Sequence, residues 1–220
     1  MNTASDTTPP RRHLTGAIVP ALAAAGLAGL AAMVVVSTQG EMGANAPPAG
    51  CITRQVGNIG GPISLLDTNG HGVTQADLTS SGASVVYFGF TRCPDACPTT
   101  MYALAQALQN PNGYDIQSVF ITLDPERDTP AVMGAYVKTN GFPQGLIGLT
   151  GSPAQTKAAA DEFKVSFAKT PTSDGDYTID HTSLLYVMDA TWHTAAVMPT
   201  NNATPQSIAA CIAAGLRRAA

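Results

Sequence analysis

The sequence has few charged side chains and no cluster of one sign. Only 12% of its 220 residues are charged, and 11 Lys and Arg face 15 Asp and Glu, giving a formal net charge of -4 at pH 7. It contains no basic run that would neutralise the phosphates of a nucleic acid. Internal repeats are absent as well. We therefore expect one ordinary globular domain with an extension, and no nucleic acid partner.

The N-terminal part of the chain lacks charge over a long stretch. Residues 14–36 form an apolar run of 23 residues, close to the roughly 20 that a helix needs to cross a bilayer. Arg11 and Arg12 precede this run, and no Lys or Arg follows it until Arg54. The positive-inside rule then places residues 1–13 in the cytoplasm. We expect a single transmembrane anchor in a bacterial cytoplasmic membrane, with the remaining chain facing the periplasm.

A cleaved signal peptide is the alternative to an anchor. Ala44-Asn45-Ala46 has the small-residue form of a cleavage site, although the apolar run is longer than the usual 7 to 15 residues and Pro47 stands where the mature chain would begin. Residues 37–58 include a segment rich in small residues and proline, which predicts a linker. The folded domain is expected at 59–220.

The domain alternates strand-like and helix-like segments. A small hairpin is expected first, where residues 63–66 and 73–74 flank the turn Asp67-Thr68-Asn69-Gly70. Strand-like segments lie at 84–90, 116–123, 146–149, 183–189 and 194–198, and helix-like segments at 98–109, 130–139, 153–163 and 204–218. Strands separated by helices of this length predict right-handed crossovers and an α/β sandwich.

Two of only four cysteines lie close together, in the stretch YFGFTRCPDACP. Cys93 and Cys97 each precede a proline, which biases them away from helix-interior conformations. We expect a bent loop that enters a helix beginning at Pro98, where a missing N–H costs nothing. Both sulfurs would then lie beside a helix N-terminus, which favours thiolate over thiol. Such a loop can close to a redox-active disulfide or hold two thiolates on one metal ion.

A plain structural disulfide is the simpler interpretation of this pair, and an exported domain can keep one oxidised. A bond between residues so close in sequence would constrain the unfolded chain very little, however. Cys51 and Cys211 lie near the two ends of the domain. They are candidates for a structural disulfide, and two free, inert thiols are the alternative.

Four segments resemble, in order, those of the Sco/SenC family of thioredoxin-like copper proteins. They are Gly60-Gly61-Pro62, Tyr87 to Thr99, Asp124-Pro125-Glu126-Arg127-Asp128-Thr129-Pro130 and Asp180-His181-Thr182-Ser183. The resemblance covers about 150 residues and implies a thioredoxin-like fold after a membrane anchor. It also implies copper bound by the two cysteines and one histidine. The recipient it implies is the dinuclear copper centre of cytochrome c oxidase, during assembly.

His181 is the histidine placed to be the third ligand. It stands just before the predicted strand that begins at Ser183, where a thioredoxin-like fold carries a proline facing the reactive cysteines. Two thiolates and an imidazole suit Cu(I) or Cu(II), and zinc accepts the same set, so only the family resemblance selects copper. Asp180 is either a carboxylate that orients this imidazole or a solvated loop residue. The other three histidines are expected to be ordinary surface residues: His13, His71 and His193.

Two neighbouring features have simpler interpretations than metal binding. Asp128 or Thr129, before Pro130, is expected to cap a helix and brace its loop. Met101 lies four residues beyond Cys97 and is expected in the core.

The sequence thus predicts a membrane-anchored copper metallochaperone with Cys93, Cys97 and His181 as ligands. Its expected partners are the copper-bearing subunit of cytochrome c oxidase and a periplasmic copper donor or thiol reductant. The alternative is a thiol-disulfide reductase that acts on the cysteines of that subunit. A peroxidase is disfavoured because nothing marks a peroxidatic site.

Overall fold

A computed structural model describes residues 47–79, 82–109 and 114–219. These residues fall within one compact unit, 47–220. The predicted anchor at 14–36, the alternative cleavage site at 44–46 and His13 lie outside the described residues. Among the helices that are described, none has the length and apolar character required to span a bilayer.

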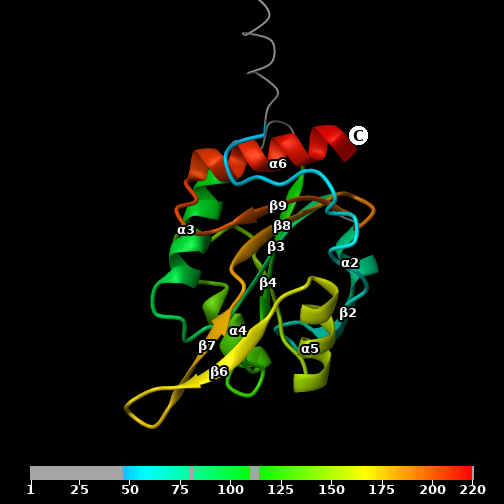
Figure 1. Cartoon of the computed structure of the whole chain (residues 1–220). Helices are drawn as coiled ribbons and strands as arrows, with labels where there is room; N and C mark the ends of the chain where they lie inside the picture. The colour runs from blue at the N-terminus through cyan, green and yellow to red at the C-terminus, as the bar shows by residue number, and fades with distance from the viewer. Residues whose placement is uncertain (1–46, 80–81, 110–113, 220) are drawn as a thin grey trace, which may run out of the picture. The chain divides into compact units, whose positions relative to one another are not determined.

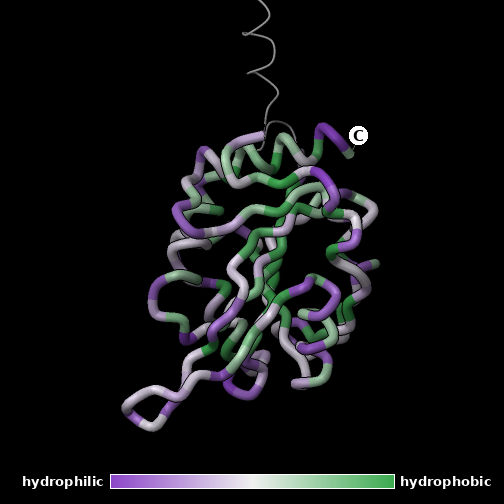
Figure 2. The backbone as a smooth tube through the Cα atoms, viewed as in Figure 1, coloured by the Kyte–Doolittle hydropathy of each residue, from purple (hydrophilic) through white to green (hydrophobic). Residues whose placement is uncertain are grey.

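A mixed sheet of five strands forms the centre of the domain (Figure 1). Its order is β5 (Ile147–Leu149), β4 (Ile116–Thr122), β3 (Ala83–Gly89), β8 (Leu184–Met188) and β9 (Thr194–Pro199). β3 pairs in parallel with β4 and antiparallel with β8. All seven residues of β3 are buried, as expected for a central strand covered on both faces. Figure 2 shows hydrophobic residues concentrated along these strands.

Helices cover this sheet and complete the predicted α/β sandwich. α3 (Ala96–Ala107) contacts α6 (Pro205–Ala219), and α6 also lies on β9. α4 (Pro130–Tyr136) contacts β5, while α5 (Pro153–Glu162) contacts β1. The short α2 (Gln75–Thr79) leads into β3. The starts of α4 and α5 follow from their sequence, since Thr129 and Ser152 cap them and proline follows each cap. The predicted thioredoxin-like α/β arrangement is confirmed.

Two hairpins lie outside the central sheet. β1 (Ser64–Leu66) and β2 (Gly72–Thr74) form the predicted N-terminal hairpin. β6 (Phe167–Pro171) and β7 (Tyr177–His181) form a second one, which extends from the body in Figure 1. The sequence predicted no element there, because only one of these ten residues is buried and they carry no strong apolar pattern.

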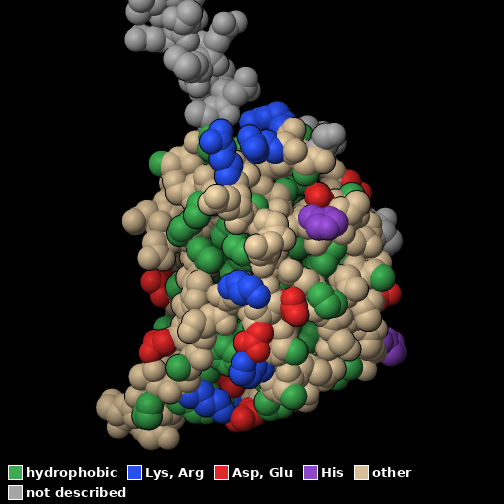
Figure 3. Space-filling view, turned by 45° about the vertical axis from the view of Figure 1, so that its right-hand side comes forward, with side chains coloured by type: hydrophobic (Ala, Val, Ile, Leu, Met, Phe, Trp, Pro, Cys, Tyr) green, Lys and Arg blue, Asp and Glu red, His purple; other side chains and the backbone are tan. Residues whose placement is uncertain are grey.

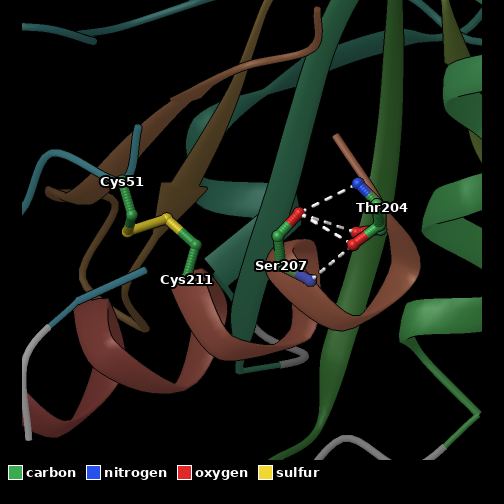
Figure 4. Close-up of a disulfide and its surroundings, with 4 residues drawn as sticks. All are labelled: Cys51, Thr204, Ser207 and Cys211. Carbon is green, nitrogen blue, oxygen red and sulfur yellow. Dashed lines mark hydrogen bonds between the residues drawn. A yellow bond between two sulfur atoms is a disulfide. The ribbon is translucent and has the colours of Figure 1, made fainter. Parts of the chain in front are cut away.

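A disulfide fastens the first described segment to the last helix. The sulfurs of Cys51 and Cys211 are 2.01 Å apart across a sequence separation of 160 residues, and Figure 4 shows the bond reaching from the incoming chain to α6. Ile52 also exchanges backbone hydrogen bonds with Val197 of β9. The segment from residue 47 onward is therefore part of the domain, which corrects the prediction of a linker up to residue 58.

The first turn of α6 is closed by a reciprocal cap, also drawn in Figure 4. The amide of Thr204 donates to Ser207 Oγ at 2.9 Å, and the amide of Ser207 donates to Thr204 Oγ1 at 3.1 Å. These bonds satisfy donors that a helix N-terminus otherwise leaves open. The helix that carries Cys211 is thus fixed at its start as well as by the disulfide.

Candidate metal and thiol site

The cysteine loop leaves the carboxyl end of the central strand β3 and enters α3. This helix begins at Ala96, two residues earlier than the predicted start at Pro98. The difference has a simple reason: the first four amides of a helix need no intrahelical acceptor, so proline is tolerated in the first turn. Cys97 consequently lies within that turn, and Cys93 lies in the loop before it.

The two thiols differ in exposure. Cys93 is partly exposed and Cys97 is fully buried, and both are free thiols in the structure. The backbone amide of Cys97 donates a hydrogen bond to Cys93 Sγ at 3.3 Å. An N–H at a helix N-terminus is therefore directed at the more accessible sulfur, as the sequence predicts.

These contacts shift the pKa values of the two thiols in opposite directions. A hydrogen bond from the Cys97 thiol lowers the pKa of Cys93 to about 6, and backbone amides and the nearby His181 add to this effect although burial opposes it. The pKa of Cys97 is raised, because it donates to Cys93, is buried and lies beside the Cys93 charge. Cys93 is therefore the thiolate of the pair near neutral pH, and Cys97 holds the proton.

Sequence reasoning missed two residues that contact the buried sulfur. The hydroxyl of Tyr87 donates to Cys97 Sγ at 3.8 Å and lies 3.1 Å from Ser183 Oγ. Gly89 approaches so closely that a Cβ atom there would lie 2.9 Å from Cys97 Sγ. A glycine inside a strand signals such a close approach, so Gly89 was open to detection from the sequence. Tyr87 gave no comparable signal.

His181, the predicted third ligand, lies at the end of β7 beside this loop. Its ring is 6.3 Å from Tyr87 and 6.2 Å from Phe90 between centroids, in edge-on orientations. Its Nδ1 lies 2.9 Å from the carbonyl oxygen of Thr182. Throughout residues 47–79, 82–109 and 114–219, no three His, Cys, Asp or Glu side chains are arranged to hold a metal ion. The structure thus brings His181 near Cys93 without closing a three-ligand site.

Asp180 makes a contact that differs from the orienting role considered for it. Its carboxylate accepts a hydrogen bond from Thr170 Oγ1 on the facing strand β6. The Asp180 carboxylate is therefore bonded to a threonine across the hairpin instead of to the imidazole of His181. His71 and His193 are exposed beside Asp67 and Asp189, as expected for surface histidines.

The loop after β4 braces the cysteine loop. Asp128 is fully buried and accepts hydrogen bonds from the amide of Thr91 at 3.0 Å and from its hydroxyl at 2.6 Å. A third bond, 2.5 Å long, comes from the hydroxyl of Thr122. The helix cap itself is Thr129. The predicted capping and bracing roles therefore belong to two adjacent residues. Met101 is fully buried in the core, as expected.

Together these residues present one ionised sulfur, one protonated buried sulfur and one imidazole at the same end of the sheet. Soft thiolates with imidazole suit Cu(I), Cu(II) or zinc. Two adjacent thiols of unequal pKa also suit thiol-disulfide exchange, because the attacking group must be a thiolate. The local chemistry thus permits metal binding and thiol exchange at a single place.

Comparison with known proteins shows which sequences and structures this chain resembles. The SCO1/SenC family model matches residues 52–217. The mitochondrial protein SCO1 homolog 1 of Arabidopsis thaliana is 44% identical over 133 residues, which are 59% of this chain and 39% of that protein. A SCO2-like protein of Rickettsia felis is 43% identical over 136 residues, or 60% of this chain and 65% of that one. The chain therefore spans less than two thirds of the length of these relatives.

Among solved structures, a crystal structure of Arabidopsis thaliana ScoI with copper bound has the same fold. It superimposes with a TM-score of 0.68 and 37% identity, covering 73% of this chain and 99% of that one. The likeness thus extends over nearly all of the chain in that copper-bound crystal structure.

Proposed function

This chain belongs to the SCO1/SenC family, and on that premise we propose that it is a membrane-anchored copper metallochaperone. Copper is its cargo, held by the Cys93 and Cys97 sulfurs and the His181 imidazole. The observation that carries the proposal is the Cys93 sulfur, which accepts a hydrogen bond from the Cys97 amide and whose pKa is lowered further by the nearby His181. Copper bound to a solved relative supports the choice of metal.

Loading and release follow from the positions of these ligands. Cys93 offers an ionised, partly exposed sulfur for first contact. Cys97 must lose its proton to become a ligand, so copper binding releases a proton. His181 would complete the set from the end of β7. Recipient ligands then replace the donor's ligands one at a time, and a site at an exposed loop favours this exchange.

The proposed recipient is the copper-bearing subunit of cytochrome c oxidase. The resemblance of four ordered motifs to the Sco/SenC family supports it, as does the predicted export of the domain to the periplasm. A periplasmic copper donor or thiol reductant is the proposed partner on the supply side. A reporter fused after Gly50 should be exported and remain with membranes, whereas a fully soluble product cut near Ala46 would establish a cleaved signal.

Copper titration of the reduced chain tests the metal site. We expect one copper per chain for the parent and for His193→Ala, whose histidine is exposed in another turn. His181→Ala should bind copper much more weakly and fail to support oxidase maturation at limiting copper. Full maturation by His181→Ala, with failure of only the cysteine variants, would reject copper delivery.

A thiol-disulfide reductase is the second candidate, favoured by the unequal thiols of Cys93 and Cys97. In that role the Cys93 thiolate attacks a recipient disulfide and forms a mixed disulfide. Cys97 then displaces the reduced recipient thiol, leaving a Cys93–Cys97 disulfide. The same His181→Ala variant separates the roles, since this exchange needs only two accessible sulfurs.

A further inference from the structure

The hairpin of residues 167–181 carries His181 at its end, and we call this segment the arm. β6 and β7 pair only with each other and form a two-stranded sheet separate from the central one. The arm extends away from the body in Figure 1. Its base is held by Ile179, which is buried in the core. Its outer part depends on side-chain contacts with the two loops around the cysteine site.

One carboxylate of the arm contacts both of these loops. Asp176 Oδ2 lies 3.1 Å from Arg92 Nη1, and Asp176 Oδ1 lies 2.9 Å from Arg127 Nη1. Arg92 directly precedes Cys93 in the sequence, and Arg127 belongs to the loop after β4. Asp176 therefore links the turn of the arm to the segment that holds the exposed thiol.

The Arg127 end of this link is firmly held. Its Nε donates to Asp124, whose side chain is fully buried, and its Nη1 donates to the carbonyl oxygen of Tyr177 at 2.9 Å. The guanidinium lies 3.7 Å from the centroid of the Tyr177 ring, and the Tyr177 hydroxyl donates to Asp124 at 2.8 Å. A charged group held by several contacts loses little side-chain entropy when it pairs with Asp176.

The Arg92 end is open to solvent. The side chains of Arg92 and Asp176 are 60% and 47% exposed, whereas that of Arg127 is 13% exposed. Figure 3 shows basic and acidic side chains interleaved on one face of the lower part of the domain, away from α6. Exposed pairs are weakened by salt and by competing charges, so this contact can open without disturbing the core.

We propose that Asp176 is a positioning residue for His181. By joining the turn of the arm to Arg92 and Arg127, it holds the arm against the cysteine loop and keeps the imidazole within reach of Cys93. Loss of both Asp176 contacts frees the turn of the arm and lets His181 move relative to the two sulfurs. This inference rests on the proposed role of His181 as a copper ligand.

Hydrogen exchange of the reduced, copper-free full chain tests whether Asp176 holds the arm against the cysteine loop. Asp176→Asn should speed exchange of the β7 amides by about threefold to tenfold, the range expected for the loss of two ion pairs. Asp174→Asn is the matched control, because Asp174 lies in the same turn and its carboxylate accepts hydrogen bonds from the Thr172 hydroxyl and the Asp176 amide. Asp176→Glu should restore slow exchange. Equal exchange in all four proteins would overturn the proposal.

Electron paramagnetic resonance of the Cu(II)-loaded chain tests the coupling to His181. Asp176→Asn should reduce the nitrogen coupling of the copper signal toward that of His181→Ala and retain the thiolate charge-transfer band. Unchanged coupling together with faster arm exchange would overturn the positioning role. If the parent and His181→Ala signals are already identical, the proposed copper ligation fails. The positioning role is then tested in the copper-free chain by modification of His181 with diethyl pyrocarbonate. Asp176→Asn should be modified faster than the parent, and equal modification rates in the two proteins would reject the proposal.

Discussion

The Tyr87 hydroxyl lies 3.8 Å from the buried sulfur of Cys97 and donates a hydrogen bond to it. The same oxygen lies 3.1 Å from Ser183 Oγ, which in turn lies 2.7 Å from Thr200 Oγ1. A chain of hydroxyl groups thus connects the less accessible sulfur with the edge of β8 and β9. Hydrogen bonds to a cysteine sulfur tune both its redox potential and that of a bound metal.

Tyr87→Phe keeps the ring and removes only this donor. Loss of a weak bond that favours the reduced sulfur should make the potential of the Cys93–Cys97 couple more negative by about 10 to 20 mV, on a scale where 30 mV corresponds to about 1.4 kcal/mol. The measurement is equilibration of the copper-free chain with glutathione buffers of known ratio.

Tyr136→Phe is the matched control for that substitution. Tyr136 is also a packed aromatic residue, and its hydroxyl is one of the buried polar atoms without a hydrogen-bond partner in the described part of the chain. Its removal should leave the potential unchanged and be neutral or slightly stabilising. Equal shifts in the two variants would show that packing, and not the bond to sulfur, sets the potential.

Cys93 should be reactive at unusually low pH. Its pKa is about 6 instead of the ordinary value near 9, so alkylation of the reduced chain in the presence of a chelator should reach half its maximal rate near pH 6. The stabilisation that accompanies this lowered pKa is fully present above the ordinary value and is lost as the pH falls through about 6. Mass mapping should find Cys97 unmodified across the same range, and its early labelling would contradict the assignment.

The sequence was sufficient for the sheet and for the position of the cysteine loop. Alternating strand and helix patterns located all five strands of the central sheet, and paired cysteines before prolines located the loop at the carboxyl end of β3. These features are encoded locally, by apolar runs, turns and caps. The start of α3 was misplaced by two residues, because the proline signal is strongest at the first helical residue and weaker at the third.

The arm and the contacts around Cys97 were not predictable in the same way. Among the ten residues of β6 and β7 only Ile179 is buried, so these strands show little hydrophobic periodicity in the sequence. The link between Asp176 and Arg92 joins residues 84 positions apart, and nothing in either local sequence indicates it. Such contacts depend on how the helices, strands and loops pack in the folded domain, and the local sequence does not specify that packing.

Breaking the bond between Cys51 and Cys211 should lower stability without altering the metal site. It joins residues 160 positions apart, so its loss frees much of the unfolded chain, and the pair of serine substitutions should cost about 2 to 4 kcal/mol in the free energy of unfolding. Urea denaturation of the parent and of Cys51→Ser/Cys211→Ser measures this. Copper stoichiometry should stay the same, and a large loss of copper would show that the bond also shapes the site.

Gly89→Ala should disturb the site through the smallest added group. A Cβ at this position would lie 2.9 Å from Cys97 Sγ and 3.0 Å from atoms of Phe120 and Tyr87, so the sulfur must move. We expect copper affinity to fall by roughly tenfold, with about 1 to 3 kcal/mol lost in stability.

Gly134→Ala is the control: its added Cβ meets Thr68 at an ordinary 3.5 Å, and alanine favours the helix by about 0.5 to 1 kcal/mol. Competition with a copper chelator measures both affinities. Unchanged binding in Gly89→Ala would show that the position of Cys97 Sγ is less constrained than its contacts indicate.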